Sequence, residues 1–78
     1  MNSLAIHLGK HSDSFEYLQA LAEKEAQSMC KTLNLALGEK QEVVFWTNGI
    51  PELIAVVHFE KKSNGEVVYN IDYSQSTL

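Results

Sequence analysis

The strongest constraint on the fold is one long helix-forming segment followed by three strand-forming segments. In SDSFEYLQALAEKEAQSMCKTLNLALG, residues 12–38, apolar side chains recur at three- or four-residue spacing, as on the buried side of a helix. Ser12, Asp13 and Ser14 are all available as N-caps, and Asp13 with Glu16 fits a variant of the capping box. Gly38 stands where a C′ glycine is expected. The sequence therefore predicts a helix over residues 13–37. Its buried stripe contains Phe15, Leu18, Leu21, Ala22, Ala26, Met29, Cys30, Leu33 and Leu37.

The stretch HLGKHSDSF, residues 7–15, has features of a ligand site but fits the start of the helix better. A phosphate-binding Walker loop would need glycine and Ser/Thr where the chain has Leu4 and His11. His7 and His11 would converge on a metal only if they lay on a helix, and Gly9 argues against one. We therefore expect no metal site in this stretch, and we expect no metal or cofactor for the protein as a whole.

Three apolar segments follow the predicted helix: QEVVFWT (41–47), ELIAVVHFEK (52–61) and EVVYNIDYS (66–74). They are rich in β-branched and aromatic residues, and the turn-forming sequences NGIP and KSNG separate them. The sequence predicts a two-layer α+β domain spanning residues 1–78, with one long helix packed on a three-stranded antiparallel meander. The alternating segment SLAIHL (3–8) is a candidate for a short extra strand at the N-terminus, which would give the order β-α-β-β-β.

The alternation in the last segment fixes the register of the sheet. Burial favours a three-residue loop, 63–65 with Gly65 left-handed, because a two-residue Asn-Gly turn would turn charged side chains toward the core. This loop places Phe59 opposite Tyr69, and the same pairing sets Phe45 opposite Ala55. It also sets Val57 opposite both Ile71 and Val43. The predicted core face is Val43, Phe45, Leu53, Ala55, Val57, Phe59, Val67, Tyr69, Ile71 and Tyr73.

The opposite face of the sheet should be polar if water covers it, but the sequence predicts an apolar patch there. Trp46 and Ile54 are expected to be cross-strand neighbours, and Ile50 lies at a turn tip beside them. Three coverings remain open: a second copy of the chain, the chain's own termini, or another protein or apolar ligand. We favour the second copy. The candidate partner-binding residues are Val44, Trp46, Ile50, Ile54, Val56 and Val68.

Few residues are arranged for chemistry. His58, with Glu42 opposite and Asp72 diagonal to it, is the best candidate for an acid/base group. A cross-strand pair of this kind is more often surface electrostatics, so we assign no catalytic residue. Cys30 lies inside the helical stripe, where a cysteine usually serves as a small apolar group.

Composition narrows the classes of partner. The chain has 78 residues, a formal net charge of −4 and no arginine, which argues against nucleic-acid binding. It lacks an apolar run long enough for a membrane span or the pattern of a secretory signal, so we expect a cytoplasmic protein. A core this small is marginal by itself, and association is a common remedy.

These observations favour a small non-enzymatic interaction protein, a regulator, inhibitor or accessory subunit, that forms a homodimer through the outer sheet face. A second hypothesis belongs to another class. It is a small ligand-binding domain or enzyme with a pocket at a dimer seam, using His58, Asp72 and Trp46.

Overall fold

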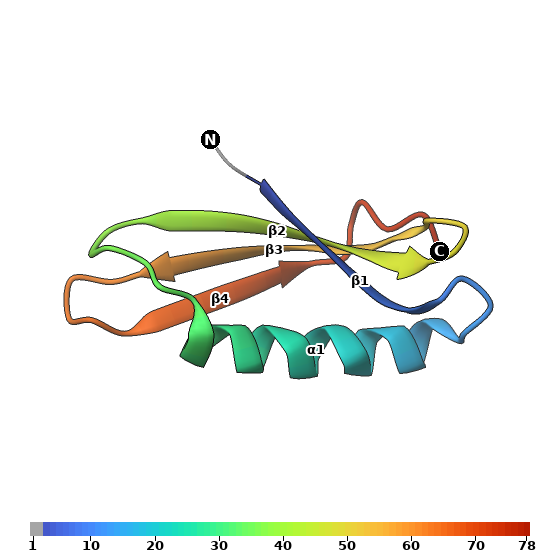
Figure 1. The fold of residues 1–78 in the computed structure, drawn as a ribbon, viewed down its shortest axis with the longest axis horizontal. Helices are drawn as coiled ribbons and strands as arrows, with labels where there is room; N and C mark the ends of the chain where they lie inside the picture. Colours follow the sequence, from blue (N-terminus) through green and yellow to red (C-terminus); the bar gives the residue numbers. More distant parts are fainter. Residues whose placement is uncertain (1–2) are drawn as a thin grey trace.

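The computed structural model describes residues 3–78, so the first two residues of the predicted domain lie outside the described part. One helix packs on one face of a four-stranded mixed sheet, which confirms the β-α-β-β-β architecture (Figure 1). The first strand is longer than predicted, because it runs past Leu8 to Lys10. The strands lie side by side in chain order, with β1 parallel to β2 and the other pairs antiparallel. The elements are β1 (Ser3–Lys10), α1 (Phe15–Thr32), β2 (Lys40–Asn48), β3 (Leu53–Lys61) and β4 (Val67–Asp72).

The segment between β1 and α1 is a helix start, as predicted, and one of the three candidate caps is used. Ser14 is the N-cap, and its hydroxyl accepts a hydrogen bond from the Tyr17 N–H at 3.2 Å. Asp13 instead closes the preceding turn, because its carboxylate accepts from the Lys10 N–H at 2.8 Å. Gly9 makes this turn possible with a φ of +56°, a conformation that strains residues with a side chain.

The helix ends at Thr32 rather than at the predicted Leu37. Thr32 and Asn34 are poor helix formers, and the extended Leu33 caps the helix by donating its N–H to the Met29 carbonyl. Leaving the helix lets Leu35 enter the core, whereas Leu37 is 65% exposed. The helical spacing of Leu33 and Leu37 was therefore misleading, and Gly38 is not the C′ residue of α1.

The β3–β4 hairpin has the predicted loop. Gly65 is left-handed with a φ of +89°, and its N–H donates to the Lys62 carbonyl at 2.9 Å. The Lys62 N–H in turn donates to the Glu66 carbonyl, which leaves a three-residue loop with a bulged glycine. The predicted pairing of Phe59 with Tyr69 is confirmed.

The β2–β3 pairing is correct up to Phe45, which lies opposite Ala55, and then shifts by one residue. Trp46 faces Leu53 instead of Ile54, so the predicted Trp46–Ile54 pair is wrong. Beyond the shift the two strands are joined through Thr47, whose N–H donates to the Glu52 carbonyl. Because the shift inserts one extra residue into β3, Ile54 enters the core and Leu53 leaves the predicted core face.

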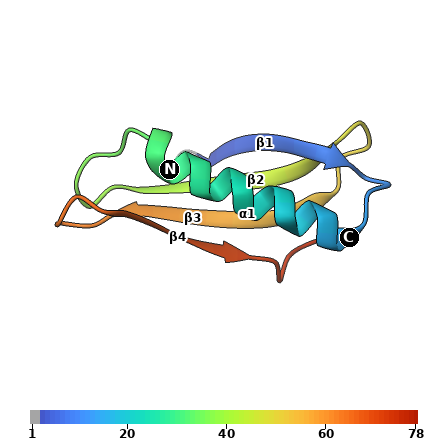
Figure 2. The same ribbon diagram turned by 90° about the horizontal axis from the view of Figure 1, so that it is seen from below.

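The core lies between α1 and the inner face of the sheet, the face that points toward the helix (Figure 2). The half-buried strand β4 contributes its alternate residues to the margin of this core. Among residues 3–78, no helix is long and apolar enough to cross a membrane. The buried cluster contains Leu18, Ala22, Ala26, Met29, Leu35, Val43, Phe45, Ile54, Ala55, Val57 and Phe59.

Candidate functional site

The candidate site is the outer face of the sheet, the face that points away from α1. The strand pairing sets its residues in rows across the sheet. One row is Ser3, Glu42, His58 and Asn70, and the next is Ala5, Val44, Val56 and Asp72. Alternation along each strand keeps these rows on one side. The contribution of β1 to these rows was not predicted, because the sequence alone did not pair β1 with β2.

The apolar part of this face is smaller than predicted and partly buried. Val56 is 8% exposed, and the neighbouring Val44 and Trp46 are half-buried. Ile54 is fully buried in the core, so it cannot contribute to a surface patch. Leu53 takes its place beside Trp46. We use the name outer patch for Val44, Trp46, Leu53 and Val56.

Two predicted members of the patch lie apart from it. Val68 pairs with Glu60, and the polar row that contains His58 separates it from Val56. Ile50 lies in the loop between β2 and β3, shortly after Trp46 in the sequence, and is 61% exposed. The structure therefore brings together Val44, Trp46 and Val56. Val68 lies in another row of the sheet, and Ile50 lies in a loop outside the strands.

The C-terminal tail, residues 74–78, returns to the sheet at one end of the outer patch. The Thr77 N–H donates to the Leu53 carbonyl at 3.0 Å, and the Leu53 N–H donates to the Thr77 hydroxyl at 2.8 Å. Figure 1 shows the tail on the side of the sheet away from α1. The tail thus provides internal cover beside Leu53, which was one of the coverings left open by the sequence.

The predicted polar group assembles next to the patch. Glu42 lies directly opposite His58, and Asp72 is diagonal to His58 because it pairs with Val56. Two hydrogen bonds from Ser74, through its side chain and its N–H, lower the pKa of Asp72, and the charge of His58 adds a smaller effect in the same direction.

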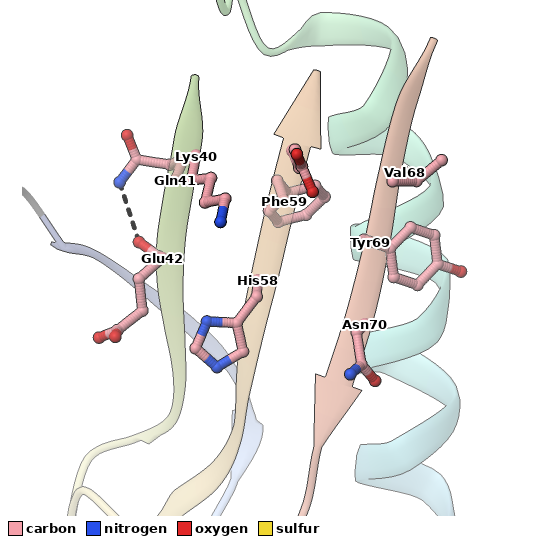
Figure 3. Close-up of a pocket in the computed structure, with 9 residues that line it drawn as sticks. Lys40, Gln41, Glu42, His58, Phe59, Val68, Tyr69 and Asn70 are labelled. Carbon is pink, nitrogen blue, oxygen red and sulfur yellow. Dashed lines mark hydrogen bonds between the residues drawn. The ribbon is translucent and has the colours of Figure 1, made fainter. Parts of the chain in front are cut away.

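A concavity of about 540 Å³ surrounds His58 at this end of the sheet (Figure 3). The Glu42 carboxylate accepts a hydrogen bond from the Ser3 hydroxyl at 3.2 Å, so it is engaged with β1. The lining residues are Lys40, Gln41, Glu42, His58, Phe59, Glu60, Val68, Tyr69 and Asn70.

The other candidate side chains do not form a chemical site. His7 lies beside Trp46 on the outer face, whereas His11 is in the turn before α1. Within the described residues, no three His, Cys, Asp or Glu side chains are grouped so that they could hold a metal ion. Burial raises the pKa of the Cys30 thiol, which disfavours the reactive thiolate.

Comparison of the chain with protein-family models, with curated proteins and with solved structures found no match. Any functional conclusion therefore depends on the geometry and chemistry of the outer face. That face combines the apolar outer patch with polar and charged side chains.

Proposed function

We propose that the protein is a small, acidic, non-enzymatic interaction module that forms a homodimer through the outer face of its sheet. It acts in the cytoplasm as a regulator, inhibitor or accessory subunit of another protein. The observation that carries the proposal is the placement of Val44, Trp46 and Val56 on the face that α1 does not cover. An antiparallel sheet with one face in water is normally polar on that face.

The energetics of burial support this proposal. Full burial of a large apolar side chain contributes about 1.5–3 kcal/mol before the costs of association are subtracted. Val44 and Trp46 retain exposed surface in the isolated chain, so a partner can bury more of it. Tryptophan is also enriched among the residues that dominate interface energies.

The charges around the outer patch suit a twofold interface. The outer face carries the acidic residues Glu42, Glu60 and Asp72 together with Lys40 and His58. In an isologous dimer each surface meets its own copy, so a surface with both signs of charge can pair acidic groups with basic ones. A surface with acidic groups alone could not.

The test is a change of Trp46→Glu, followed by light scattering at matched protein concentration. We expect the mass to fall to half that of the wild type, because a buried carboxylate without a partner is strongly disfavoured. Leu37→Glu is the matched control, since it adds the same charge at an exposed loop position. Circular dichroism checks that both variants fold. A Trp46→Glu variant that keeps the wild-type mass contradicts the proposal.

A second function is favoured by one observation, the concavity around His58. In this alternative the protein binds a small ligand, or acts on it, at a dimer seam that includes His58, Asp72 and Trp46. Replacing His58 with Ala separates the two. The interaction module keeps its fold, mass and partner, whereas a ligand site loses the stabilisation that a bound compound gives to the wild type in thermal unfolding.

A further inference from the structure

The strand β4 has an open edge along its whole length. It pairs with β3 on one side, and Figure 2 shows it along the margin of the sheet, with neither a strand nor the helix beyond it in the described part of the chain. The N–H and C=O groups on such an edge are a template for another strand. Its central residues, Val67–Ile71, carry no charged side chain and no proline.

The hairpin bonds show which backbone groups face the open edge. Lys62 bonds to Glu66, and hydrogen-bonded pairs alternate along an antiparallel ladder, so Val68 and Asn70 also bond toward β3. Lys61 confirms this phase, because both its N–H and its carbonyl bond on the β2 side. The N–H and C=O groups of the intervening residues, Val67, Tyr69 and Ile71, therefore point outward.

The other edge of the sheet is protected in a way that β4 is not. The pairing of β1 shifts between His7 and Lys10, where the left-handed Gly9 bends the strand. A bulge and a terminal lysine are two devices that prevent pairing at an edge. The β3–β4 register, in contrast, runs without a shift from Lys61 to Val56.

We propose that a second copy of this chain pairs antiparallel with β4, with the twofold axis passing through Asn70. In this register Asn70 faces the partner's Asn70, and Tyr69 faces the partner's Ile71. Val68 faces the partner's Asp72. The alternative axis at Tyr69 would place Glu66 against the partner's Asp72, and two carboxylates directly opposite each other are unfavourable.

The chemistry of the edge suits this occupant. Tyr69 and Ile71 lie on the inner face and are only half-buried, packed against the margin of the core. Pairing an aromatic with a β-branched residue across two strands is a favourable contact, and the twofold makes it twice. The outward N–H and C=O groups of both residues gain partners in the same step.

The pairing extends the two four-stranded sheets into one continuous sheet. Its twofold axis is perpendicular to the sheet, so both copies of α1 lie on one side and both outer faces lie on the other. This contact joins the backbone edge of β4, whereas the outer-face dimer buries the outer patch. Because Asn70 also lies in an outer-face row, the Asn70→Cys cross-link, and not the mass of Asn70→Lys alone, identifies the edge pairing. It also places the two outer patches in one larger surface.

The first test is Asn70→Lys. Asn70 is exposed in the single chain, so the substitution should leave the fold intact. At the twofold it opposes two ammonium groups, and we expect light scattering to show half the wild-type mass. Asn34→Lys makes the same change at an exposed position after α1 and should have no effect. An Asn70→Lys variant that keeps the wild-type mass overturns the edge pairing.

A cross-linking test checks the register. Non-hydrogen-bonded antiparallel pairs have Cα atoms about 4.5 Å apart, which is within the range of a disulfide. In a Cys30→Ala background, Asn70→Cys should form a covalent dimer on oxidation. Val68→Cys should not, because it faces the partner's Asp72. Equal cross-linking of the two variants, or none of Asn70→Cys, overturns the register.

The edge pairing and the outer-face dimer fail separately. If both contacts form, Trp46→Glu and Asn70→Lys each halve the assembly, and the double variant has the mass of one chain. If only Asn70→Lys changes the mass and Asn70→Cys cross-links, the outer-face proposal fails and the edge pairing stands. If only Trp46→Glu changes it, the reverse holds.

Discussion

The two faces of the sheet alternate residue by residue along the same strands, yet they differ in what covers them. Phe45 on the inner face is completely buried under α1, whereas the next residue, Trp46, is half-buried on the outer face. The inner face is closed by a second layer of structure. The outer face has no helix over it in the described part of the chain, and the C-terminal tail is hydrogen-bonded to Leu53 at one end of it.

The comparison shows that burial alone does not identify a core. Val56 is 8% exposed, almost as little as the inner-face valines, but it does not belong to the cluster that packs against α1. It lies on the outer face, in the row of Ala5, Val44 and Asp72. Beside it, Val44 and Trp46 retain exposed surface that a partner can bury, whereas Val43 and Val57 have none.

The largest expected effect comes from Phe45→Ala, which should lower the free energy of unfolding by about 3–5 kcal/mol because it leaves a cavity under the helix. Trp46→Ala, one residue along, should cost the single chain only about 1–2 kcal/mol, since less of its surface is removed from water. Urea denaturation at a concentration where the protein has the mass of one chain measures both. Equal losses would mean that the two faces are equally closed.

The next effect concerns the turn that carries the chain from the sheet into the covering layer. A Cβ on Gly9 would lie 2.7 Å from Leu18 Cδ2 and 2.9 Å from Asp13 Oδ2. Gly9→Ala should therefore cost about 2–3 kcal/mol, from left-handed strain and crowding together. Gly49→Ala is the control, because its φ of +76° carries the strain while nothing lies within 4 Å of its Cβ. Equal losses would show that contact with α1 contributes nothing.

Thr47 joins β2 to the β2–β3 loop, next to the register shift that moves Ile54 into the core. Its buried hydroxyl donates to the Ile50 carbonyl and accepts from the Glu52 N–H, each at 2.9 Å. Thr47→Val keeps the shape but leaves both groups without this partner, so we expect a loss of about 1–3 kcal/mol in thermal or urea unfolding. A neutral result would mean that the loop reorganises and water replaces the hydroxyl.

Most of the fold could be predicted because the local rules agree with burial. The loop at 63–65 followed from the alternation of Val67, Tyr69 and Ile71, and this one decision set the register as far as Phe45. The position of Glu42 and Asp72 around His58 followed from the same register. These predictions needed only a side-chain period of two and one turn type.

The failures lie where a backbone irregularity interrupts a regular pattern. The extra residue in β3 moved Ile54 into the core, and nothing in the alternating sequence distinguishes that position from Val56. The helix end was missed because Leu33 and Leu37 keep helical spacing by coincidence. The signal that could have found it was the pair of weak helix formers, Thr32 and Asn34.

The stability contributed by Tyr73 and by Asp72, which lie next to each other on opposite faces, should depend on pH in opposite directions. Tyr73 is half-buried beside α1, where burial, and then its hydrogen bond to Glu23, raise its pKa from 10 to about 12. The stability that depends on the neutral phenol is therefore complete below pH 10 and is lost as the pH rises toward 12. Tyr73→Phe should cost about 0.5–1.5 kcal/mol at neutral pH and remove that alkaline decline. An unchanged alkaline decline in urea unfolding would contradict this assignment.

The smallest effect is expected from Asp72, and its contribution to stability changes with pH in the direction opposite to that of Tyr73. The two hydrogen bonds from Ser74, and then the charge of His58, lower its pKa below 3.8, so the folded chain favours the carboxylate. The resulting stability is present above pH 3.8 and is lost as the pH falls through the lower pKa of the folded state. The Asp72→Asn variant has no carboxylate, so it lacks this contribution to stability at every pH. The unfolding curves of the wild type and the variant should therefore differ near neutral pH and converge in acid, while Tyr73→Phe should leave the acid limb unchanged. A wild type that gains stability relative to Asp72→Asn as the pH falls would show that the carboxylate is disfavoured in the fold, and that His58 and Ser74 do not stabilise it on the outer face.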